Sequence, residues 1–228
     1  MPVYRIPQEL VFPDPELADE DGLLGVGGDL STERLLLAYA NGIFPWFSAG
    51  EPIKWWSPDP RCVLLPGELR ISKSLWDSIR KKQYEVTFDK QFEEVIRQCS
   101  AVRRKGQRGT WITEGMQRAY VELHRKGYAH SVEVWMDGEL AGGLYGVAIG
   151  KSYSGESMFH LRPDASKIAL YHLVEHLRDR GFPLIDCQVT NQHLLSLGAM
   201  EMTRSDFLKA LRKNASKPGH HESWGLKG

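Results

Sequence analysis

A stretch rich in proline and aromatic residues limits what the first quarter of the chain can fold into. Residues 44–61 read FPWFSAGEPIKWWSPDPR and contain three Trp, two Phe and four Pro in 18 positions. Proline fixes φ and lacks an N–H, so the stretch excludes a regular helix or a central strand. We predict a rigid aromatic loop with at least one ring facing a ligand; the alternative is a hydrophobic plug. The loop would complete a small N-terminal domain, residues 1–60, ahead of a larger domain, residues 61–228.

The charge of the 228-residue chain sums to zero but is unevenly distributed. Residues 1–60 hold 3 basic and 10 acidic side chains (net −7), whereas residues 61–128 hold 15 basic and 8 acidic ones (net +7). Basic residues cluster at 80–82 and at 97–108. Such a pattern predicts a polyanionic partner for the middle segment, and a solvated face is the alternative.

Several classes of protein are excluded by the sequence. No apolar run approaches the roughly 20 residues of a membrane span, and the N-terminus lacks the features of a signal peptide. Cys62, Cys99 and Cys187 are far apart and form no CxxC pair, which excludes a disulfide scaffold or a cysteine-rich zinc site. We therefore expect a cytoplasmic protein.

Hydrophobic periodicity and turn signals predict an α+β fold, in which helices flank a mixed sheet as in an acyltransferase layer. Ser31 and Thr113 are expected to cap helices, as is Asp89 for a helix over 89–100. Asp137-Gly138 predicts a two-residue hairpin turn. The other expected helices span 72–82 and run from Ser166 to Gly181, and the expected strands span 62–65, 129–136, 139–149, 151–159 and 183–189.

Two of the predicted strands carry polar groups that suggest a site. Strand alternation places Asp186 and Gln188 on one face and Ile185 and Cys187 on the other. Glu156 lies in another strand next to the same predicted helix. A carboxylate inside a hydrophobic strand is costly unless it is paired or used, so these residues are candidates for chemistry. Structural hydrogen-bond anchors are the alternative, and packing is the expected role of Cys187.

The chain resembles the bacterial leucyl/phenylalanyl-tRNA–protein transferase family. The resemblance rests on GVGGDLS, GIFPWFS, WWSPDPR, GTWIT, HSVEVW, GGLYGV, GESMF, ASK and LIDCQV-x-N-x-H-x-x-SLGA, and runs from about Gly22 to Phe207. It implies a GNAT-like acyltransferase domain with a mixed, mostly antiparallel sheet flanked by helices, beside the small N-terminal domain. It also implies transfer of Leu or Phe, and possibly Met, from tRNA to the N-terminal Arg or Lys of proteins, which marks them for N-end-rule degradation.

The resemblance also implies roles for individual residues. Trp46 and Trp111 would stack on the 3′-adenosine of the tRNA. Asp186, Gln188 and Glu156 would be catalytic, with Gln188 accepting a hydrogen bond from the attacking amine and polarised by Asp186. The aminoacyl side-chain pocket would consist of Leu144, Tyr153, Met158, Leu173 and Ile185, where the family tends to have Met at 144 and Phe at 153 and 173.

We expect the tRNA phosphates to contact Arg80, Lys81, Lys82 and Arg104. Because the ester of an aminoacyl-tRNA is already activated, the reaction needs no cofactor and no metal. The expected partners are Leu-tRNA, Phe-tRNA and proteins with N-terminal Arg or Lys, and the expected state is a monomer without membrane contact.

Two other functions fit the sequence less well. An acyl-CoA N-acyltransferase would carry a glycine-containing pyrophosphate loop, but residues 159–167 contain no glycine. A non-catalytic RNA-binding module would explain the basic segment and the aromatic residues, but not Glu156, Asp186 and Gln188.

Overall fold

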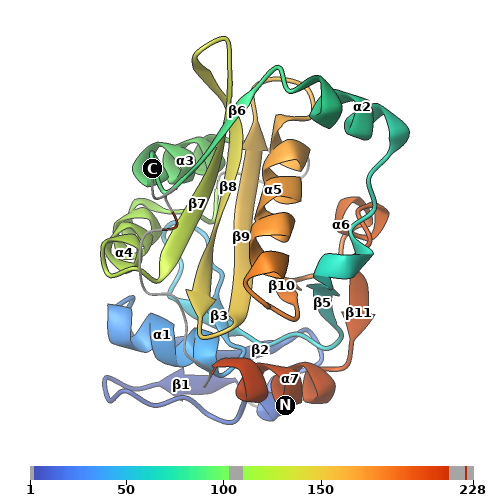
Figure 1. The fold of residues 1–228 in the computed structure, drawn as a ribbon. Coiled ribbons are helices and arrows are strands. Elements are labelled where there is room, and N and C mark those ends of the chain that lie inside the picture. The colour runs from blue at the N-terminus through green and yellow to red at the C-terminus, as the bar shows by residue number, and fades with distance from the viewer. Residues whose placement is uncertain (1–2, 103–109, 216–223, 225–228) are drawn as a thin grey trace.

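The computed structural model describes residues 3–102, 110–215 and 224 and contains two β-sheets (Figure 1). The smaller sheet has the strand order β1-β2-β4-β3 and is accompanied by helix α1 (Thr32–Ala40), which Ser31 caps as expected. Its strands are β1 (Tyr4–Ile6), β2 (Leu23–Gly27), β3 (Phe44–Pro45) and β4 (Lys54–Trp56).

One expectation for the aromatic stretch is wrong, because Lys54–Trp56 is an inner strand of the small sheet, between β2 and β3. Pro52 and Pro58 lie outside this strand, so they remove none of its ladder hydrogen bonds. Pro45 lies in β3, which is an edge strand, where a missing N–H is tolerated.

The larger sheet has seven strands in the order β11-β5-β10-β9-β8-β7-β6. Among the pairings of this larger sheet in the described residues, only β9–β10 is parallel, so the expected mixed, mostly antiparallel sheet flanked by helices is confirmed. Its strands are β5 (Arg61–Leu64), β6 (Glu85–Phe88), β7 (Ala129–Met136), β8 (Glu139–Ile149), β9 (Ser152–His160), β10 (Ile185–Gln188) and β11 (Met200–Met202).

Helices cover both faces of the larger sheet (Figure 1). One hydrophobic cluster joins the sheet to α2 (Lys73–Lys81), α5 (Ala165–Asp179) and the end of α6 (Gln192–Ser196). A second cluster joins the other face to α3 (Phe92–Ala101) and α4 (Glu114–Arg125), and it also includes α1 and the small sheet. Helix α7 (Arg204–Ala215) packs on β5 through a third cluster.

The expected start of the α3 helix is wrong. Asp89 has a left-handed φ of 58° at the end of β6, and its carboxylate accepts hydrogen bonds from the Ser131 N–H (3.0 Å) and from His130 (2.9 Å). The N–H of Gln91 instead donates to the buried carboxylate of Glu133 on β7 (3.3 Å). The helix therefore begins at Phe92, where a neighbouring strand supplies the acceptor that local sequence did not.

Trp224 belongs to the core although it lies far along a polar C-terminal segment. Its side chain is 4% exposed and stacks on His130 with ring centroids 4.0 Å apart. Its backbone N–H donates to Asp89 (2.6 Å). The Trp224 side chain thus fills space between α5 and the sheet. No helix in the described part is long and apolar enough to cross a membrane.

Candidate active site

A pocket of about 490 Å³ opens where β9 and β10 separate. The two strands pair only at Ile185↔Tyr153 and Asp186↔Ser154. Where two neighbouring strands part, side chains rather than backbone hydrogen bonds fill the space between them. The walls come from β8, β9, β10, α5 and α6, with the aromatic stretch on one side; the lining residues include Phe44, Trp46, Leu64, Trp111, Leu144, Glu156, Met158, Leu170, Leu173, Ile185, Cys187, Gln188, Asn191, His193 and Leu194.

Four of the five residues expected to form a side-chain pocket do line this cavity: Leu144, Met158, Leu173 and Ile185. Tyr153 does not line the pocket. Its side chain is fully buried and its ring centroid lies 5.6 Å from that of Trp224, so it faces the core on the α5 side. Tyr153 therefore supports the strand that bears the pocket and does not shape the cavity.

Both expected stacking residues lie on the pocket. Trp46 and Trp111 line it, and Trp46 is 36% exposed. The backbone oxygen of Trp46 accepts a hydrogen bond from the Trp56 indole (2.7 Å), which fixes the loop that carries the ring. Trp55 is fully buried. The aromatic stretch thus does both things considered for it: Trp55 fills the hydrophobic core, and Trp46 borders the cavity.

Asp186 is buried in an ion pair and does not reach the pocket surface. Its carboxylate accepts two hydrogen bonds from Arg61, from Nε (2.8 Å) and from Nη2 (2.7 Å). The Arg61 side chain is 1% exposed and the Asp186 side chain 2%. The Arg61 guanidinium lies 4.6 Å from the ring centroid of Phe207 and 4.9 Å from that of Phe44. Ser154 donates a further hydrogen bond to Asp186 (3.3 Å). A bidentate pair this buried fixes the start of β10 in place.

A bulge interrupts the expected alternation along β10. Asp186 pairs with Val63 and Gln188 with Cys62, which leaves Cys187 as the extra residue. Gln188 has a left-handed φ of 59°, and its N–H donates to the Asp186 carboxylate (3.0 Å). Cys187 and Gln188 both line the pocket, whereas Asp186 does not. Asp186 thus contacts the backbone of Gln188 and not its side-chain amide.

A second bulge places Glu156 at the same pocket. Tyr145 pairs with Ser157 and Gly146 with Gly155, so Glu156 is the extra residue of β9. Its Oε1 accepts a hydrogen bond from Gln188 Nε2 (3.0 Å). This bond joins the two bulges across the gap between β9 and β10.

Two tyrosines continue the hydrogen-bond chain away from the pocket. Tyr120 on α4 donates to Glu156 Oε2 (3.1 Å), and the Tyr120 and Tyr39 hydroxyls are hydrogen-bonded to each other. Burial raises the pKa of Glu156 to about 7, although the hydroxyls of Tyr39 and Tyr120 act in the opposite direction. The carboxyl group therefore changes protonation state near neutral pH, at a point that touches Gln188.

This shift predicts a pH-dependent stability. The pKa of Glu156 is about 7 in the folded state, above the ordinary value of 4.5. The contribution of Glu156 to the free energy of unfolding is therefore fully present below pH 4.5 and is lost as the pH rises through 7. Urea unfolding of the native protein and of Glu156→Gln should differ in their pH dependence, with the native protein losing on the order of 2 kcal/mol more between pH 5 and pH 8. Parallel curves for the two proteins would contradict the raised pKa.

Three of the four expected phosphate-binding residues, Arg80, Lys81 and Lys82, lie at the end of α2. Lys81 and Lys82 line a hollow of about 760 Å³ together with residues of the β7–β8 hairpin. Arg80 is exposed but is not part of that lining. Arg104 lies outside the described residues.

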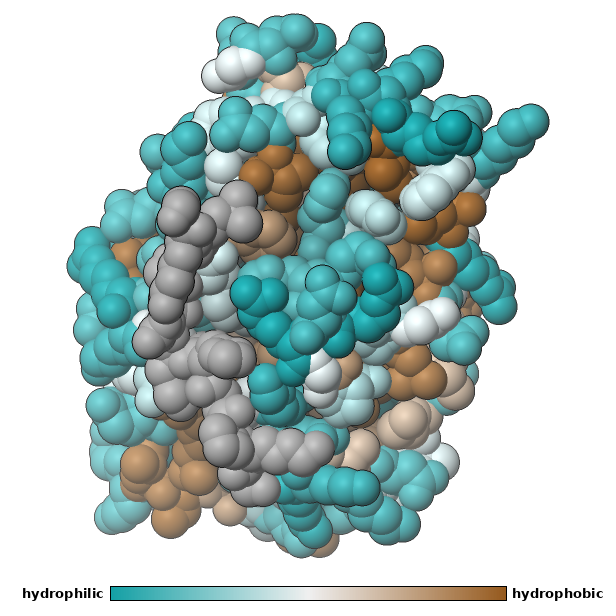
Figure 2. All heavy atoms as spheres, in the orientation of Figure 1, coloured by the Kyte–Doolittle hydropathy of each residue, from teal (hydrophilic) through white to brown (hydrophobic). Residues whose placement is uncertain are grey.

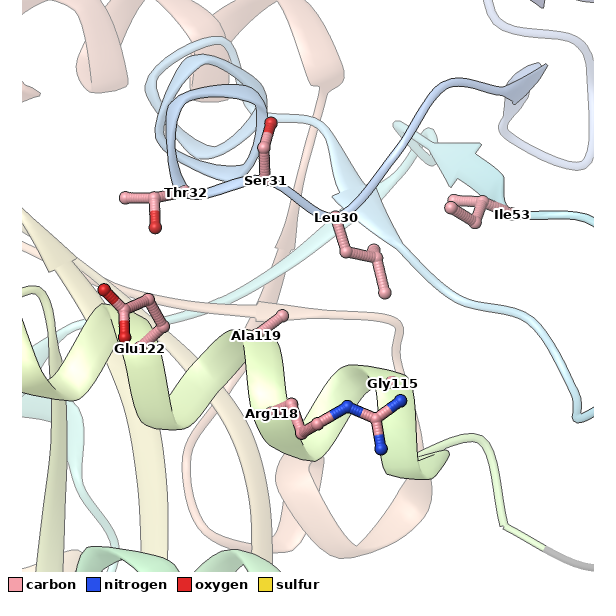
Figure 3. Close-up of a pocket in the computed structure, with 8 residues that line it drawn as sticks. All are labelled: Leu30, Ser31, Thr32, Ile53, Gly115, Arg118, Ala119 and Glu122. Carbon is pink, nitrogen blue, oxygen red and sulfur yellow. The ribbon is translucent and has the colours of Figure 1, made fainter.

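A further hollow, of about 460 Å³, lies between the start of α1 and helix α4 (Figure 3). Arg118 and Glu122 are its charged lining residues, and Arg118 forms an exposed ion pair with Glu114 (3.6 Å). No hydrogen-bonded polar pair of the kind formed by the partly buried Glu156 and Gln188 lines this hollow. The pocket at β9 and β10 is therefore the candidate site. The described residues contain no group of three or more His, Cys, Asp or Glu placed to hold a metal ion.

Three residues that build the site were not singled out from the sequence. Arg61 opens a buried strand, and its charge at that position was a signal that it needs a buried partner. Tyr39 and Tyr120 lie on the buried faces of α1 and α4, where an aromatic residue at helical spacing looks like ordinary core. Only the fold brings their hydroxyls to Glu156.

Comparison with known proteins gives consistent matches over most of the chain. A family model described as leucyl/phenylalanyl-tRNA protein transferase matches residues 63–212, and a model for the N-terminal domain of that protein matches residues 28–59. A protein of Syntrophobacter fumaroxidans named leucyl/phenylalanyl-tRNA–protein transferase is 59% identical over 98% of this chain and 96% of its own length. A protein of the same name from Anaeromyxobacter sp. (strain K) is 54% identical over 100% of this chain and 98% of its own length.

Solved structures with a partly similar arrangement include FemX and L-PGS from Bacillus licheniformis. FemX gives a TM-score of 0.48 at 12% identity over 75% of this chain and 66% of its own. L-PGS gives a TM-score of 0.42 at 12% identity over 74% of this chain and 53% of its own.

Proposed function

The chain belongs to the leucyl/phenylalanyl-tRNA protein transferase family, and on this premise we propose that it transfers Leu or Phe from aminoacyl-tRNA to the N-terminal Arg or Lys of a protein. The product carries a new peptide bond and a destabilising N-terminal residue, which marks the protein for N-end-rule degradation. The enzyme acts in the cytoplasm, as a monomer.

One observation carries the proposal: a pocket with an apolar wall has the hydrogen-bonded pair Gln188 and Glu156 on its lining. The apolar wall suits an uncharged side chain such as that of Leu or Phe. The polar pair is placed to meet the ester that joins this side chain to tRNA. Met158 is unbranched and adapts its shape, which suits a pocket that accepts both side chains.

Trp46 and Trp111 would hold the terminal adenosine by stacking, which contributes about 1–3 kcal/mol per base. Both rings border the pocket, so the adenosine and the aminoacyl side chain can be bound together. Arg80, Lys81 and Lys82 would contact phosphates farther along the tRNA. Their exposed positions leave them accessible to such a ligand.

Catalysis would depend on positioning, since the ester is already activated. The neutral α-amine of the acceptor attacks the ester carbonyl, so a C–N bond forms and the bond to the ribose 3′ oxygen breaks. Gln188 donates a hydrogen bond from Nε2 to Glu156. This bond orients the Gln188 amide so that its own Oε1 can accept a hydrogen bond from the attacking amine. The amine proton passes to the departing 3′ oxygen through the neighbouring ribose hydroxyl. Asp186 acts as a positioning residue, because its contacts are to Arg61, Ser154 and the Gln188 backbone.

The side chain of the acceptor's N-terminal Arg or Lys is a cation close to the reacting amine. Glu156 lines the pocket and is anionic above a pH of about 7, so it is the acidic group best placed to attract that cation. Transfer to an N-terminal Arg should therefore become more efficient as Glu156 loses its proton.

A transfer assay tests the proposal. Radiolabelled Leu-tRNA is incubated with the protein and a peptide with N-terminal Arg, and with a matched peptide with N-terminal Gly. Label that enters only the Arg peptide, and that is abolished by prior RNase treatment of the donor, is the expected result. Label transfer from acetyl-CoA, with none from Leu-tRNA, would instead support an acyl-CoA N-acyltransferase.

A further inference from the structure

A pair of aromatic side chains on the surface of α2 and α5 has no role in the site described so far. Trp76 on α2 is 42% exposed, although Leu75 and Ile79 on the same helix are buried. Its ring meets that of Tyr171 on α5 in a T-shaped contact, with centroids 6.1 Å apart and planes at 81°. In this geometry the edge of one ring meets the face of the other, so ring faces remain open to a ligand.

Basic residues flank the exposed tryptophan along the helix. Lys73 precedes Trp76 by three residues and Arg80 follows it by four, so both lie beside it on the helix surface. Both are exposed, and within the described part of the chain neither forms an ion pair. Asp77 lies on the far side of Lys73, toward Lys81, and so away from Trp76.

Helix α5 carries both Tyr171 and part of the wall of the candidate site. Leu170, next to Tyr171 in sequence, lines the pocket. Lys167 lies one helical turn before Tyr171 and its side chain is 39% exposed, with Asp164 3.1 Å away. A chain that leaves the pocket along α5 would therefore pass Lys167 and the aromatic pair before it reaches Lys73 and Arg80. Hydrophilic side chains cover most of the face in Figure 2, with hydrophobic ones in small patches, some of them near α2.

We propose that Trp76 and Tyr171 bind an unpaired base in the 3′ strand of the donor tRNA, while Lys73 and Arg80 contact the adjacent phosphates. The proposal rests on the proposed function and extends its donor site beyond the terminal adenosine. Aromatic faces interleaved with cations are how proteins hold single-stranded nucleic acid without reading its sequence. A protein partner would fit the apolar ring equally well, but it would give no reason for unpaired cations on both sides of it.

Trp76→Ala is the central variant, with Trp76→Phe to retain an aromatic face. Leu10→Ala is the matched control, because Leu10 is exposed to a similar extent (49%) but lies in the N-terminal segment. KM and kcat are measured with Leu-tRNA and with leucyl-adenosine, which keeps the ester and the terminal nucleoside but lacks the rest of the strand. Direct binding of tRNA to each variant is measured by fluorescence anisotropy.

Trp76→Ala should raise KM and Kd for tRNA by about fivefold or more, the loss of one stacked base. Its kcat at saturating tRNA and its activity with leucyl-adenosine should be unchanged, and Trp76→Phe should recover most of the affinity. An unchanged Kd, or an equal loss with both donors, would overturn the proposal. An inactive native protein would instead argue against the proposed function, and Kd for tRNA would still decide whether Trp76 contacts the nucleic acid.

Discussion

Replacing Arg61 with methionine should lower the free energy of unfolding by about 3–5 kcal/mol, the usual effect of removing one partner from a buried ion pair. The guanidinium supplies two hydrogen bonds to the Asp186 carboxylate and lies between the rings of Phe44 and Phe207. Methionine would fill part of the volume but leave the Asp186 carboxylate without a cation. Urea denaturation monitored by circular dichroism measures the change.

The double variant Arg61→Met, Asp186→Leu is the control. It removes both charges and should recover much of the lost stability, because an apolar pair of similar volume often replaces a buried ion pair at little cost. Transfer activity should stay low, since the Gln188 N–H would lose its acceptor. A loss below 1 kcal/mol in the single variant would show that the pair contributes little to the fold.

Replacing Gln188 with glycine should lower kcat by about 100-fold and leave the affinity for tRNA nearly unchanged. In the proposed mechanism Gln188 contributes a hydrogen-bonding amide at the reacting amine, whereas the apolar wall and the tryptophans would hold the donor. Glycine suits the left-handed φ of 59° at this position, so the substitution removes the side chain without straining the backbone. Single-turnover rates at saturating Leu-tRNA report the effect.

Gln188→Ala and Val189→Ala serve as comparisons. Alanine retains the backbone strain of the native residue, so equal losses in the glycine and alanine variants would assign the effect to the missing amide. Val189 also lines the pocket and is 42% exposed, and its truncation should change kcat little. A glycine variant with full activity would exclude Gln188 from the chemical step.

The main elements of the larger sheet could be predicted from the sequence because its strands and helices have clear local signals. Asp137-Gly138 forms the expected turn between β7 and β8, with both residues at positive φ. Thr113 caps α4 as expected. The start of α3 could not be predicted, because its acceptor, Glu133, lies more than 40 residues away in the chain.

The candidate site was predictable in its residue types but not in its geometry. Glu156 and Gln188 could be named because polar residues in hydrophobic strands are unusual, and the fold brings them within hydrogen-bond distance. The bulge between Asp186 and Gln188 could not be predicted, because it leaves no mark on the hydropathy of the sequence. The pairing of Asp186 with Arg61 joins residues 125 apart, beyond the reach of local patterns.

The two bulges make the site depend on the exact number of residues in β9 and β10. Glu156 and Cys187 are each one residue more than regular pairing requires. Deleting one codon at either position would restore an even ladder and turn the following side chains to the other face of the sheet. In each strand, the one extra residue therefore decides which side chains face the cavity, while the order of the strands in the sheet stays the same.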